Sequence, residues 1–232
     1  MFGQQKFNFR TFNNQGFLGG KEDTKIYNSS IDYINVIYKP EFIKEKQADK
    51  FLRIFEKNLI YNKDVDSKVK IMGKYYTIPR KQVGYGEPGT YYKFAGNIVY
   101  ANNWNEDNVI CRVIKSIKKK VESLTNEKFN FVLINRYSNG SHSIGHHFDD
   151  EKDLLEKSSI IGVSFGAKRD IQFKAINIKP VTLPNLINIS LSHGSCIVMK
   201  DPTNENWKHA IPKRSNIKNP RISLTFRSIN LN

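Results

Sequence analysis

"FNFVLINRY", residues 129–137, marks the point where the chain changes character. The sequence before it contains two amphipathic helical patterns. The sequence after it contains short runs rich in β-branched and aromatic residues, separated by turn residues. These runs are "FNFVLINRY" (129–137), "SIIGVSF" (159–165), "DIQFKA" (170–175), "GSCIVMK" (194–200) and "RISLTFRSI" (221–229). Such spacing is typical of an antiparallel sandwich or barrel, so we predict an α+β protein with a mainly β core.

The N-terminal half predicts one strand and two helices. Apolar residues from Ile31 to Tyr38 suggest the strand, and Pro40 with Glu41 is typical of a helix start. The first helix has apolar residues at helical spacing, at Ala48, Phe51, Leu52, Phe55 and Leu59. The second is expected from about Asp107 to Leu124, with Val109, Val113, Ile114, Ile117, Val121 and Leu124 facing inward. Its Lys118, Lys119 and Lys120 are interpreted as a solvated face rather than a binding patch.

Composition indicates one folded domain. The 232 residues are 39% hydrophobic and 12% aromatic, which is too apolar for a disordered chain. Residues 1–28 are rich in Asn, Gln, Gly and Lys and are expected to form a poorly ordered, basic and polar arm. The remainder, 29–232, lacks a low-complexity linker and is therefore interpreted as a single domain.

The charge balance points to a polyanionic partner. Thirty-seven Lys and Arg against 22 Asp and Glu give a formal charge of +15, which favours nucleic acid first and acidic membrane surfaces second. No apolar run is long enough to span a bilayer, and the N-terminus lacks a signal-peptide core. Cys111 and Cys196 show no pairing pattern and are expected to be reduced core residues. We expect an intracellular monomer without a membrane partner, nuclear if its source is eukaryotic.

"IGHHFDDE", residues 144–151, is either a solvated polar loop or half of a metal site. On a strand end, His147 and Asp149 point the same way because they are two residues apart, whereas His146 and Asp150 point elsewhere. Two histidines and one carboxylate are the ligand set of non-haem Fe(II) oxygenases, so a distant histidine is still required. His209, in "NWKHAIPKR", is favoured over His193, which has the turn context "LSHGS". By itself this pattern is a modest signal.

"RISLTFR", residues 221–227, alternates strictly between polar and apolar residues. It is either an ordinary strand with one wet face, or a strand whose Arg221, Thr225 and Arg227 line a barrel interior and hold a dicarboxylate. Arginine suits that task because its planar fork donates to a carboxylate in two places. Asn135 and Tyr137, which have the same two-residue spacing, are candidates for further hydrogen bonds to that ligand.

Five segments together resemble the AlkB family of iron- and 2-oxoglutarate-dependent nucleic-acid dealkylases, in particular its eukaryotic branch that repairs duplex DNA. They are "GKYYTIPRKQVGYG" (73–86), "INRYSNGSHSIGHHFDDE" (134–151), "GVSFGAKRDIQFK" (162–174), "LSHGSCIVMKDPTNENWKHAIPKR" (191–214) and "PRISLTFR" (220–227). They occur in the family's order, and the stretch from the first to the last of them, 73–227, spans about two thirds of the chain. The resemblance implies a double-stranded β-helix, or jelly roll, with flanking N-terminal helices and a nucleotide-recognition lid at about residues 65–100.

The resemblance also implies a chemistry and roles for particular residues. Iron would be bound by His147, Asp149 and His209. The carboxylates of 2-oxoglutarate would be held by Arg221 and Arg227, with Asn135, Tyr137 and Thr225 assisting. Family members use Fe(II), 2-oxoglutarate and O2 to oxidise an N-methyl group on bases such as 1-methyladenine or 3-methylcytosine, and release formaldehyde, succinate and carbon dioxide.

A base in a duplex reaches such a site only after it is flipped out of the stack. By resemblance, Tyr92, Lys93 and Phe94 of "TYYKFAG" would lie over the flipped base, and Asp150 and Glu151 would contact the base or its flanks. Arg80, Gln82, Lys213 and Arg214 are further candidate substrate contacts, together with Lys81. The four cations among them would contact phosphates unless they are only solvated surface charges.

"VKIMGKYYTIPRKQ", residues 69–82, is expected to form a hairpin with strands 69–72 and 75–79 and a turn at Gly73 and Lys74. In the duplex-repairing relatives a bulky apolar residue at the position of Met72 enters the base stack, which suits an apolar wedge. The alternative is that Met72 packs back onto Ile71 or the core.

Two residues depart from the branch pattern: Phe148 replaces an Arg or small polar residue, and His146 replaces a Glu. Both leave the ligand set intact but put base preference and the opposite-strand contact in doubt. The alternatives are an RNA demethylase of the same family, an enzyme of this fold that acts on protein, and a non-catalytic nucleic-acid binder. The basic charge disfavours a protein substrate, the complete triad disfavours loss of catalysis, and DNA is favoured over RNA on the resemblance.

Overall fold

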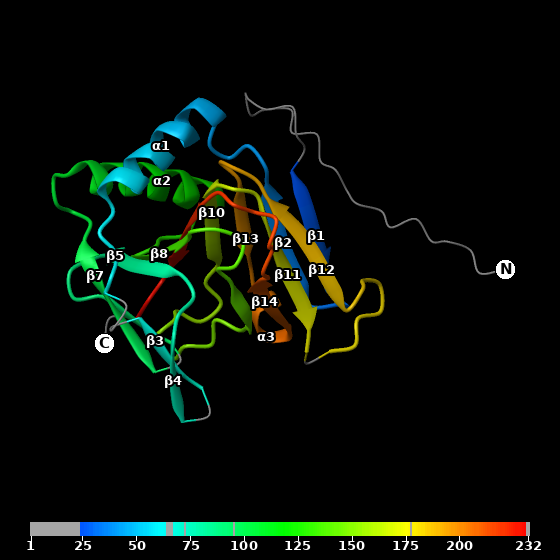
Figure 1. The fold of residues 1–232 in the computed structure, drawn as a ribbon. Coiled ribbons are helices and arrows are strands. Elements are labelled where there is room, and N and C mark those ends of the chain that lie inside the picture. The colour runs from blue at the N-terminus through cyan, green and yellow to red at the C-terminus, as the bar shows by residue number, and fades with distance from the viewer. Residues whose placement is uncertain (1–23, 64–66, 72, 95, 177, 231–232) are drawn as a thin grey trace.

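The computed structural model describes residues 24–63, 67–71, 73–94, 96–176 and 178–230 (Figure 1). The helices are α1 (Glu45–Asn58), α2 (Val109–Thr125) and α3 (Thr203–Asn206). The strands are β1 (Lys25–Ser29), β2 (Ile34–Lys39), β3 (Lys68–Ile71), β4 (Lys74–Thr77), β5 (Lys81–Gly86), β6 (Tyr91–Phe94), β7 (Asn97–Asn103), β8 (Phe131–Tyr137), β9 (Ile144–His147), β10 (Ile160–Gly166), β11 (Arg169–Ala175), β12 (Leu186–Leu191), β13 (Cys196–Met199), β14 (Trp207–Ile211) and β15 (Arg221–Arg227).

The strands form a jelly roll from two main sheets. The larger sheet has the order β1-β2-β13-β10-β15-β8-β5-β7-β6, and the smaller has the order β12-β11-β14-β9. The strand pairs are antiparallel except for β5 with β7, which is parallel. Side chains from both sheets line one cavity between them, so the space enclosed by the jelly roll holds the candidate site. The predicted mainly β fold with flanking helices is therefore confirmed.

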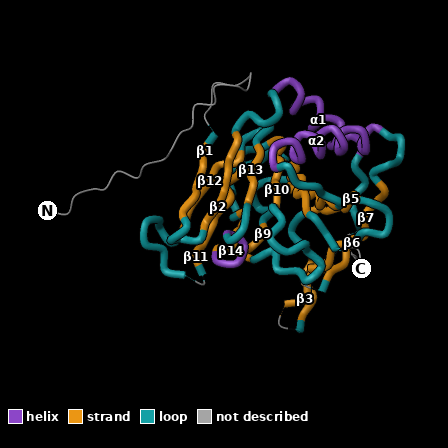
Figure 2. Tube along the Cα trace, turned by 180° about the vertical axis from the view of Figure 1, so that it is seen from behind, coloured by secondary structure: helices purple, strands orange, loops and turns teal. Residues whose placement is uncertain are grey.

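Helices α1 and α2 cover the face of the larger sheet that points away from this cavity (Figure 2). Phe165 of β10 packs edge-on against Phe51 and Phe55 of α1, with ring centroids 6.2 and 5.6 Å apart. Ile222, Leu224 and Phe226 of β15 point into the same core. The cavity face of the larger sheet is thereby left free for polar side chains.

The start of the chain differs from the sequence-based expectation in two respects. Of the expected arm at 1–28, residues 1–23 lie outside the described residues, whereas Lys25–Ser29 forms β1, which pairs with β2 in antiparallel register. Helix α1 begins at Glu45 rather than at Pro40 and Glu41. The reason is that Ile43 is buried and donates its backbone N–H to the carbonyl of Gly194, 2.9 Å away, so the connection stays extended until it has passed the sheet.

Helix α2 matches its prediction closely. It begins after Asn108, whose side chain accepts a hydrogen bond from the backbone N–H of Cys111 at 2.9 Å. Lys118 is paired with Glu122 at 2.9 Å, and Lys119 and Lys120 are exposed, in agreement with a solvated face. Both cysteines are free and buried, as expected.

The β3–β4 hairpin projects from the body of the protein (Figure 1). Lys74 pairs with Ile71 and therefore belongs to β4 rather than to the turn, whereas Gly73 remains in the turn with φ of 80°. Met72 lies outside the described residues, so its predicted finger role stays a prediction.

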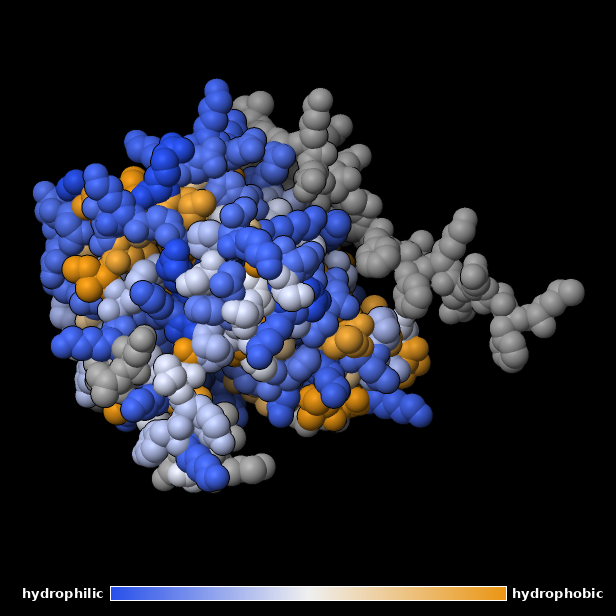
Figure 3. Space-filling view, viewed as in Figure 1, coloured by the Kyte–Doolittle hydropathy of each residue, from blue (hydrophilic) through white to orange (hydrophobic). Residues whose placement is uncertain are grey.

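Elsewhere hydrophilic side chains dominate the outer surface over the helices (Figure 3). Among the helices of the described segments, none is both long and apolar enough to cross a membrane.

Replacing Phe55 by alanine should lower the free energy of unfolding by about 3–5 kcal/mol, because a fully buried ring is lost from the interface between α1 and the sheet. Urea denaturation of the purified variant measures this change. The control is Lys50→Ala on the exposed side of the same helix, which should change stability by less than about 0.5 kcal/mol. Equal stabilities of the two variants would show that α1 does not pack on the sheet in this way.

Candidate active site

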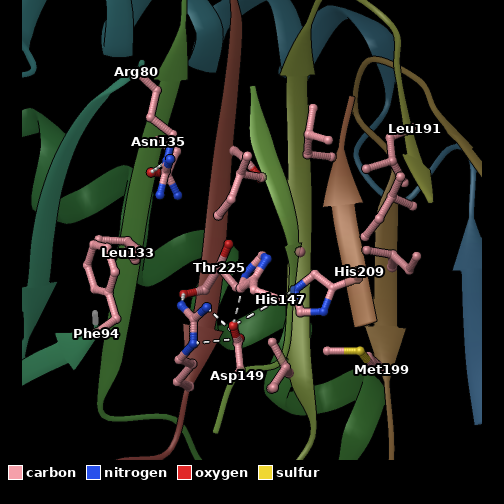
Figure 4. A pocket seen from close by; sticks show the side chains of 18 of the residues that line it. Arg80, Phe94, Leu133, Asn135, His147, Asp149, Leu191, Met199, His209 and Thr225 are labelled. Carbon is pink, nitrogen blue, oxygen red and sulfur yellow. Dashed lines mark hydrogen bonds and ion pairs between the residues drawn. The ribbon is translucent and has the colours of Figure 1, made fainter. Parts of the chain in front are cut away.

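Three potential metal ligands meet at one end of the cavity (Figure 4). His147 ends β9 and lies directly opposite His209 of β14 in the strand register. Asp149 follows two residues after His147, and its Oδ1 is 3.5 Å from His147 Nε2 and 3.8 Å from His209 Nε2. One ligand atom from each residue lies within 4.8 Å of the others, which is a spacing that a single cation can bridge.

The two imidazoles present the correct nitrogen atoms for a metal. His147 Nδ1 lies 2.9 Å from the carbonyl of Gly145 and donates to it, which leaves Nε2 free. Burial and the neighbouring His147 lower the pKa of His209 to about 3. His209 is therefore neutral near pH 7, as a ligand must be.

Asp149 divides its two oxygen atoms between different partners. Arg227 donates from Nη2 at 2.6 Å and from Nε at 3.1 Å to Oδ2, whereas Oδ1 faces the histidines. Burial alone raises the pKa of Asp149, but Arg227 and the two imidazoles outweigh that effect and hold the pKa well below its usual value. The carboxylate is therefore charged near pH 7 and offers one free oxygen to a cation.

The other candidate ligands lie elsewhere. His146 and Asp150 are exposed, as the alternation along the strand predicts. His193 accepts a hydrogen bond from the backbone N–H of Gly166 at 2.8 Å, and its Nε2 is 3.2 Å from Asp49 of α1. The structure thus brings His209, and not His193, to the cluster.

Strand β15 supplies the polar wall of the cavity, as its alternation predicts. The residues that line it from this strand are Arg221, Ser223, Thr225 and Arg227. Arg221 is 2% exposed and donates from Nη2 to Ser164 and Ser223, at 2.8 and 3.2 Å. Its Nε and Nη1 have no hydrogen-bond partner among the described residues, and burial lowers its pKa to about 10. Two unpaired buried donors on one guanidinium fit a carboxylate ligand.

Asn135 and Tyr137 of β8 also line the cavity, on the same face of the strand. The Tyr137 ring packs against two guanidinium groups, with Arg221 at 5.3 Å and Arg169 at 5.6 Å from its centroid. Asn135 accepts a hydrogen bond from Arg80 Nε at 3.0 Å. Both residues therefore face the cavity that Arg221 also lines, and their role in cosubstrate binding stays a prediction.

Arg80 and Gln82 correct two expectations. Arg80 was expected at the surface, either as a phosphate contact or as a solvated charge, but it is only 8% exposed and lines the cavity. Its hydrogen bond to Asn135 keeps its guanidinium inside. Gln82 was expected to contact substrate, yet its side chain is completely buried within the sheet and is not among the residues that line the cavity.

Three of the expected base contacts lie at the cavity: Tyr92, Phe94 and Glu151. Tyr92 packs against Phe94, with ring centroids 5.5 Å apart, and the guanidinium of Arg227 lies 4.5 Å from the Tyr92 centroid. Burial, followed by the charge of Asp149, raises the pKa of Glu151 to about 7. Lys93 and Asp150 instead line a second, more open hollow next to it, which Phe94 and Glu151 share.

The remaining candidates are not gathered at the cavity. Gly73 and Lys74 belong to the projecting hairpin. Lys213 is exposed, whereas Arg214 forms an ion pair with Asp170 at 2.8 Å, so its charge is already balanced. A phosphate contact therefore suits Lys213 better than Arg214.

Sequence reasoning missed three residues that hold the site together. Arg169 is 1% exposed and donates to the carbonyls of Asn139, His142 and Pro212. Ser164 accepts from Arg221, and Asn204 bonds to the main chain of Asp149. All three lie in segments that resemble the family, at 162–174 and 191–214, but no local pattern in the sequence marks them out.

Comparisons with known proteins agree with this geometry. Residues 35–227 match the family model described as "2OG-Fe(II) oxygenase superfamily". The DNA oxidative demethylase ALKBH2 of Mus musculus is 38% identical over 186 residues, which cover 79% of this chain and 75% of the mouse protein. The ALKBH2 of Homo sapiens is also 38% identical, over 79% of this chain and 69% of its own. The human alpha-ketoglutarate-dependent dioxygenase alkB homolog 3 is 29% identical over 82% of this chain and 64% of its own.

Two solved structures share the fold at low sequence identity. OsALKBH1 superposes with a TM-score of 0.52 and 14% identity, over 83% of this chain and 97% of its own. A prolyl hydroxylase from Trichoplax adhaerens superposes with a TM-score of 0.53 and 10% identity, over 84% of this chain and 83% of its own. These likenesses support the jelly-roll architecture alone.

Replacing Arg221 by lysine should weaken 2-oxoglutarate binding about 10- to 150-fold, because a charge-assisted hydrogen-bond pair contributes about 1.5–3 kcal/mol and lysine lacks the planar fork. Calorimetric titration of 2-oxoglutarate into Mn(II)-loaded protein measures the affinity. Arg53→Lys, on the exposed side of α1, is the matched control and should bind as the unmodified protein does. Unchanged affinity in Arg221→Lys would remove Arg221 from the cosubstrate site.

Proposed function

We propose that this chain, which belongs to the AlkB family within the 2OG-Fe(II) oxygenase superfamily, demethylates damaged bases in DNA by oxidation. One observation carries the proposal: a His-Asp-His cluster and an arginine with two donors unpaired among the described residues face the same cavity between the two sheets. Fe(II) bound there, with 2-oxoglutarate and O2, would supply the oxidising power that removes the methyl group as formaldehyde.

Different residues of the cavity would bind the metal and the 2-oxoglutarate. His147, Asp149 and His209 would hold the metal through Nε2, Oδ1 and Nε2, which face one another in the cavity. Arg221 would bind a carboxylate of 2-oxoglutarate, and Tyr137, which packs against its guanidinium, would fix its direction. Asn135, Thr225 and Arg227 line the same space and would complete the cosubstrate site.

The methylated base would enter beside Tyr92, Phe94 and Glu151. A base must leave the stack to reach a cavity that lies between two sheets, and the two aromatic rings offer apolar walls for it. A Glu151 carboxyl with a pKa of about 7 can carry a proton near neutral pH and donate a hydrogen bond to the base edge. The strands and connections at about residues 65–100, including the β3–β4 hairpin, would act as the nucleotide-recognition lid.

The proposal that the substrate is DNA is supported by the relatives and not by the cavity. Both relatives at 38% identity are DNA oxidative demethylases. The +15 charge suits either nucleic acid. We further propose that the protein acts as a monomer on duplex DNA, and in the nucleus if its source is eukaryotic.

The direct test is formaldehyde release from oligonucleotides that carry 1-methyladenine or 3-methylcytosine, as single-stranded DNA, duplex DNA and RNA. We expect release that requires Fe(II) and 2-oxoglutarate. His209→Ala and Asp149→Ala should abolish it in folded protein, and His193→Ala, which alters contacts to Gly166, Asp49 and Phe165 away from the cluster, should retain most of it. Full activity in both triad variants would contradict the assignment.

Binding of DNA without any turnover would favour a non-catalytic relative, and preference for RNA would favour the RNA demethylase.

Met72→Ala should reduce turnover of methylated duplex DNA far more than turnover of methylated single strands. Unstacking costs a few kcal/mol in a duplex and little in a single strand, and an inserted apolar side chain offsets that cost. Met72→Phe should preserve or raise duplex activity. Rates on matched duplex and single-stranded substrates measure the effect, and equal losses on both would favour packing of Met72 within the protein.

Lys213→Gln should lower the slope of log affinity against log salt concentration by about 0.7–0.9, the value for one lost phosphate contact. Arg214→Gln should have a smaller effect on this slope, because Arg214 is paired with Asp170. Fluorescence anisotropy of labelled duplex at several salt concentrations gives the slope. Lys119→Gln, on the helix layer, serves as the control, and a Lys213→Gln slope equal to that control would make Lys213 a solvated charge only.

A further inference from the structure

The side chain of Asn204 forms two hydrogen bonds with the main chain of Asp149. Its Oδ1 accepts from the backbone N–H of Asp149 at 3.0 Å, and its Nδ2 donates to the carbonyl oxygen of Asp149. One amide thus pairs with both polar backbone groups of a single residue, as a neighbouring strand would. The main chain of Asp149, a candidate metal ligand, is therefore held by the side chain of Asn204, which is 55 residues away in the sequence.

Asp149 needs this partner because the strand ladder stops before it. The last residue of β9 is His147, which is paired with His209. Asp149 lies beyond that pair, yet its side chain is almost completely buried. A backbone N–H and C=O left unpaired in such a place would each cost about 1–3 kcal/mol. The Asn204 amide takes the place of a strand partner for Asp149, two residues beyond the last residue of β9.

Asn204 is itself attached to a fixed part of the fold. It belongs to α3, where the neighbouring Thr203 accepts a hydrogen bond from the backbone N–H of Asn35 of β2 at 2.6 Å. At the end of this helix, Trp207 is fully buried and donates from Nε1 to the carbonyl of Asp32 at 2.8 Å. His209 follows two residues later on β14. One short segment therefore carries a histidine of the cluster and the amide that positions its carboxylate.

We propose that Asn204 is a positioning residue for the metal centre, which sets the direction in which Asp149 presents Oδ1 to the cation. The inference rests on the proposed function only for the identity of the three ligands. Arg227 fixes the other carboxylate oxygen, Oδ2, so the two contacts are complementary: Arg227 holds the side chain, and Asn204 holds the backbone from which it extends. Without Asn204 the metal would have to order the Asp149 backbone as it binds, and its affinity would fall.

Calorimetric titration of metal-free protein with Co(II), which binds without turnover, tests the proposal. Asn204→Ala should raise the dissociation constant about 10- to 100-fold, the usual range for loss of a residue that orients a metal ligand. Asn206→Ala is the matched control, since Asn206 lies in the same helix and its side chain donates to the carbonyl of Pro202 at 3.0 Å instead of to Asp149. Its Co(II) affinity should equal that of the unmodified protein.

A second measurement separates positioning from a general structural effect. If Asn204 acts through the metal, excess Fe(II) should restore the kcat of Asn204→Ala to that of the unmodified protein. Asn204→Asp, which keeps the acceptor but loses the donor, provides a second variant should the alanine protein fail to fold, and it too should bind Co(II) more weakly. Equal Co(II) affinity of the unmodified protein and of a folded Asn204 variant would overturn the inference. If the unmodified protein itself bound no Co(II), the metal-centre assignment would fall together with it.

Discussion

The buried ion pair between Asp149 and Arg227 is the contact on which the site depends. It joins the segment after β9 of the smaller sheet to the end of β15 in the larger sheet, and both side chains are almost fully buried. Removal of either partner would leave an uncompensated buried charge, which costs about 3–5 kcal/mol. Because Arg227 is engaged in this way, the carboxylate of a ligand is left to Arg221, which lines the cavity and has two buried donors without a partner among the described residues.

The jelly roll explains why these residues meet. Antiparallel register places His147 opposite His209, and the two-residue period of a strand turns Asp149 to the same side as His147. The same period places four polar residues of β15 on the cavity face and three apolar residues against the helices. Helices α1 and α2 pack on the outer face alone, so one face of the larger sheet stabilises the fold while the other is available for chemistry.

The features that follow from local periodicity could be predicted from the sequence. The alternation in β15, the pairing of His147 with Asp149 and the extent of α2 are of this kind. The features that depend on contacts distant in sequence could not. Arg80 is buried because it meets Asn135, 55 residues away in the chain, and the start of α1 depends on the contact of Ile43 with Gly194. Asn204 was missed for the same reason, since nothing local indicates that its amide meets Asp149.

The central claim is that His147, Asp149 and His209 form an Fe(II) site next to a 2-oxoglutarate site. The most direct measurement is the visible charge-transfer absorption that arises when 2-oxoglutarate chelates protein-bound Fe(II), recorded without O2. We expect the band to appear only when both are added and to saturate at about one Fe(II) per chain, as a single facial triad requires. The absence of a band in the folded, unmodified protein, or an undiminished band in Asp149→Ala, would contradict the account.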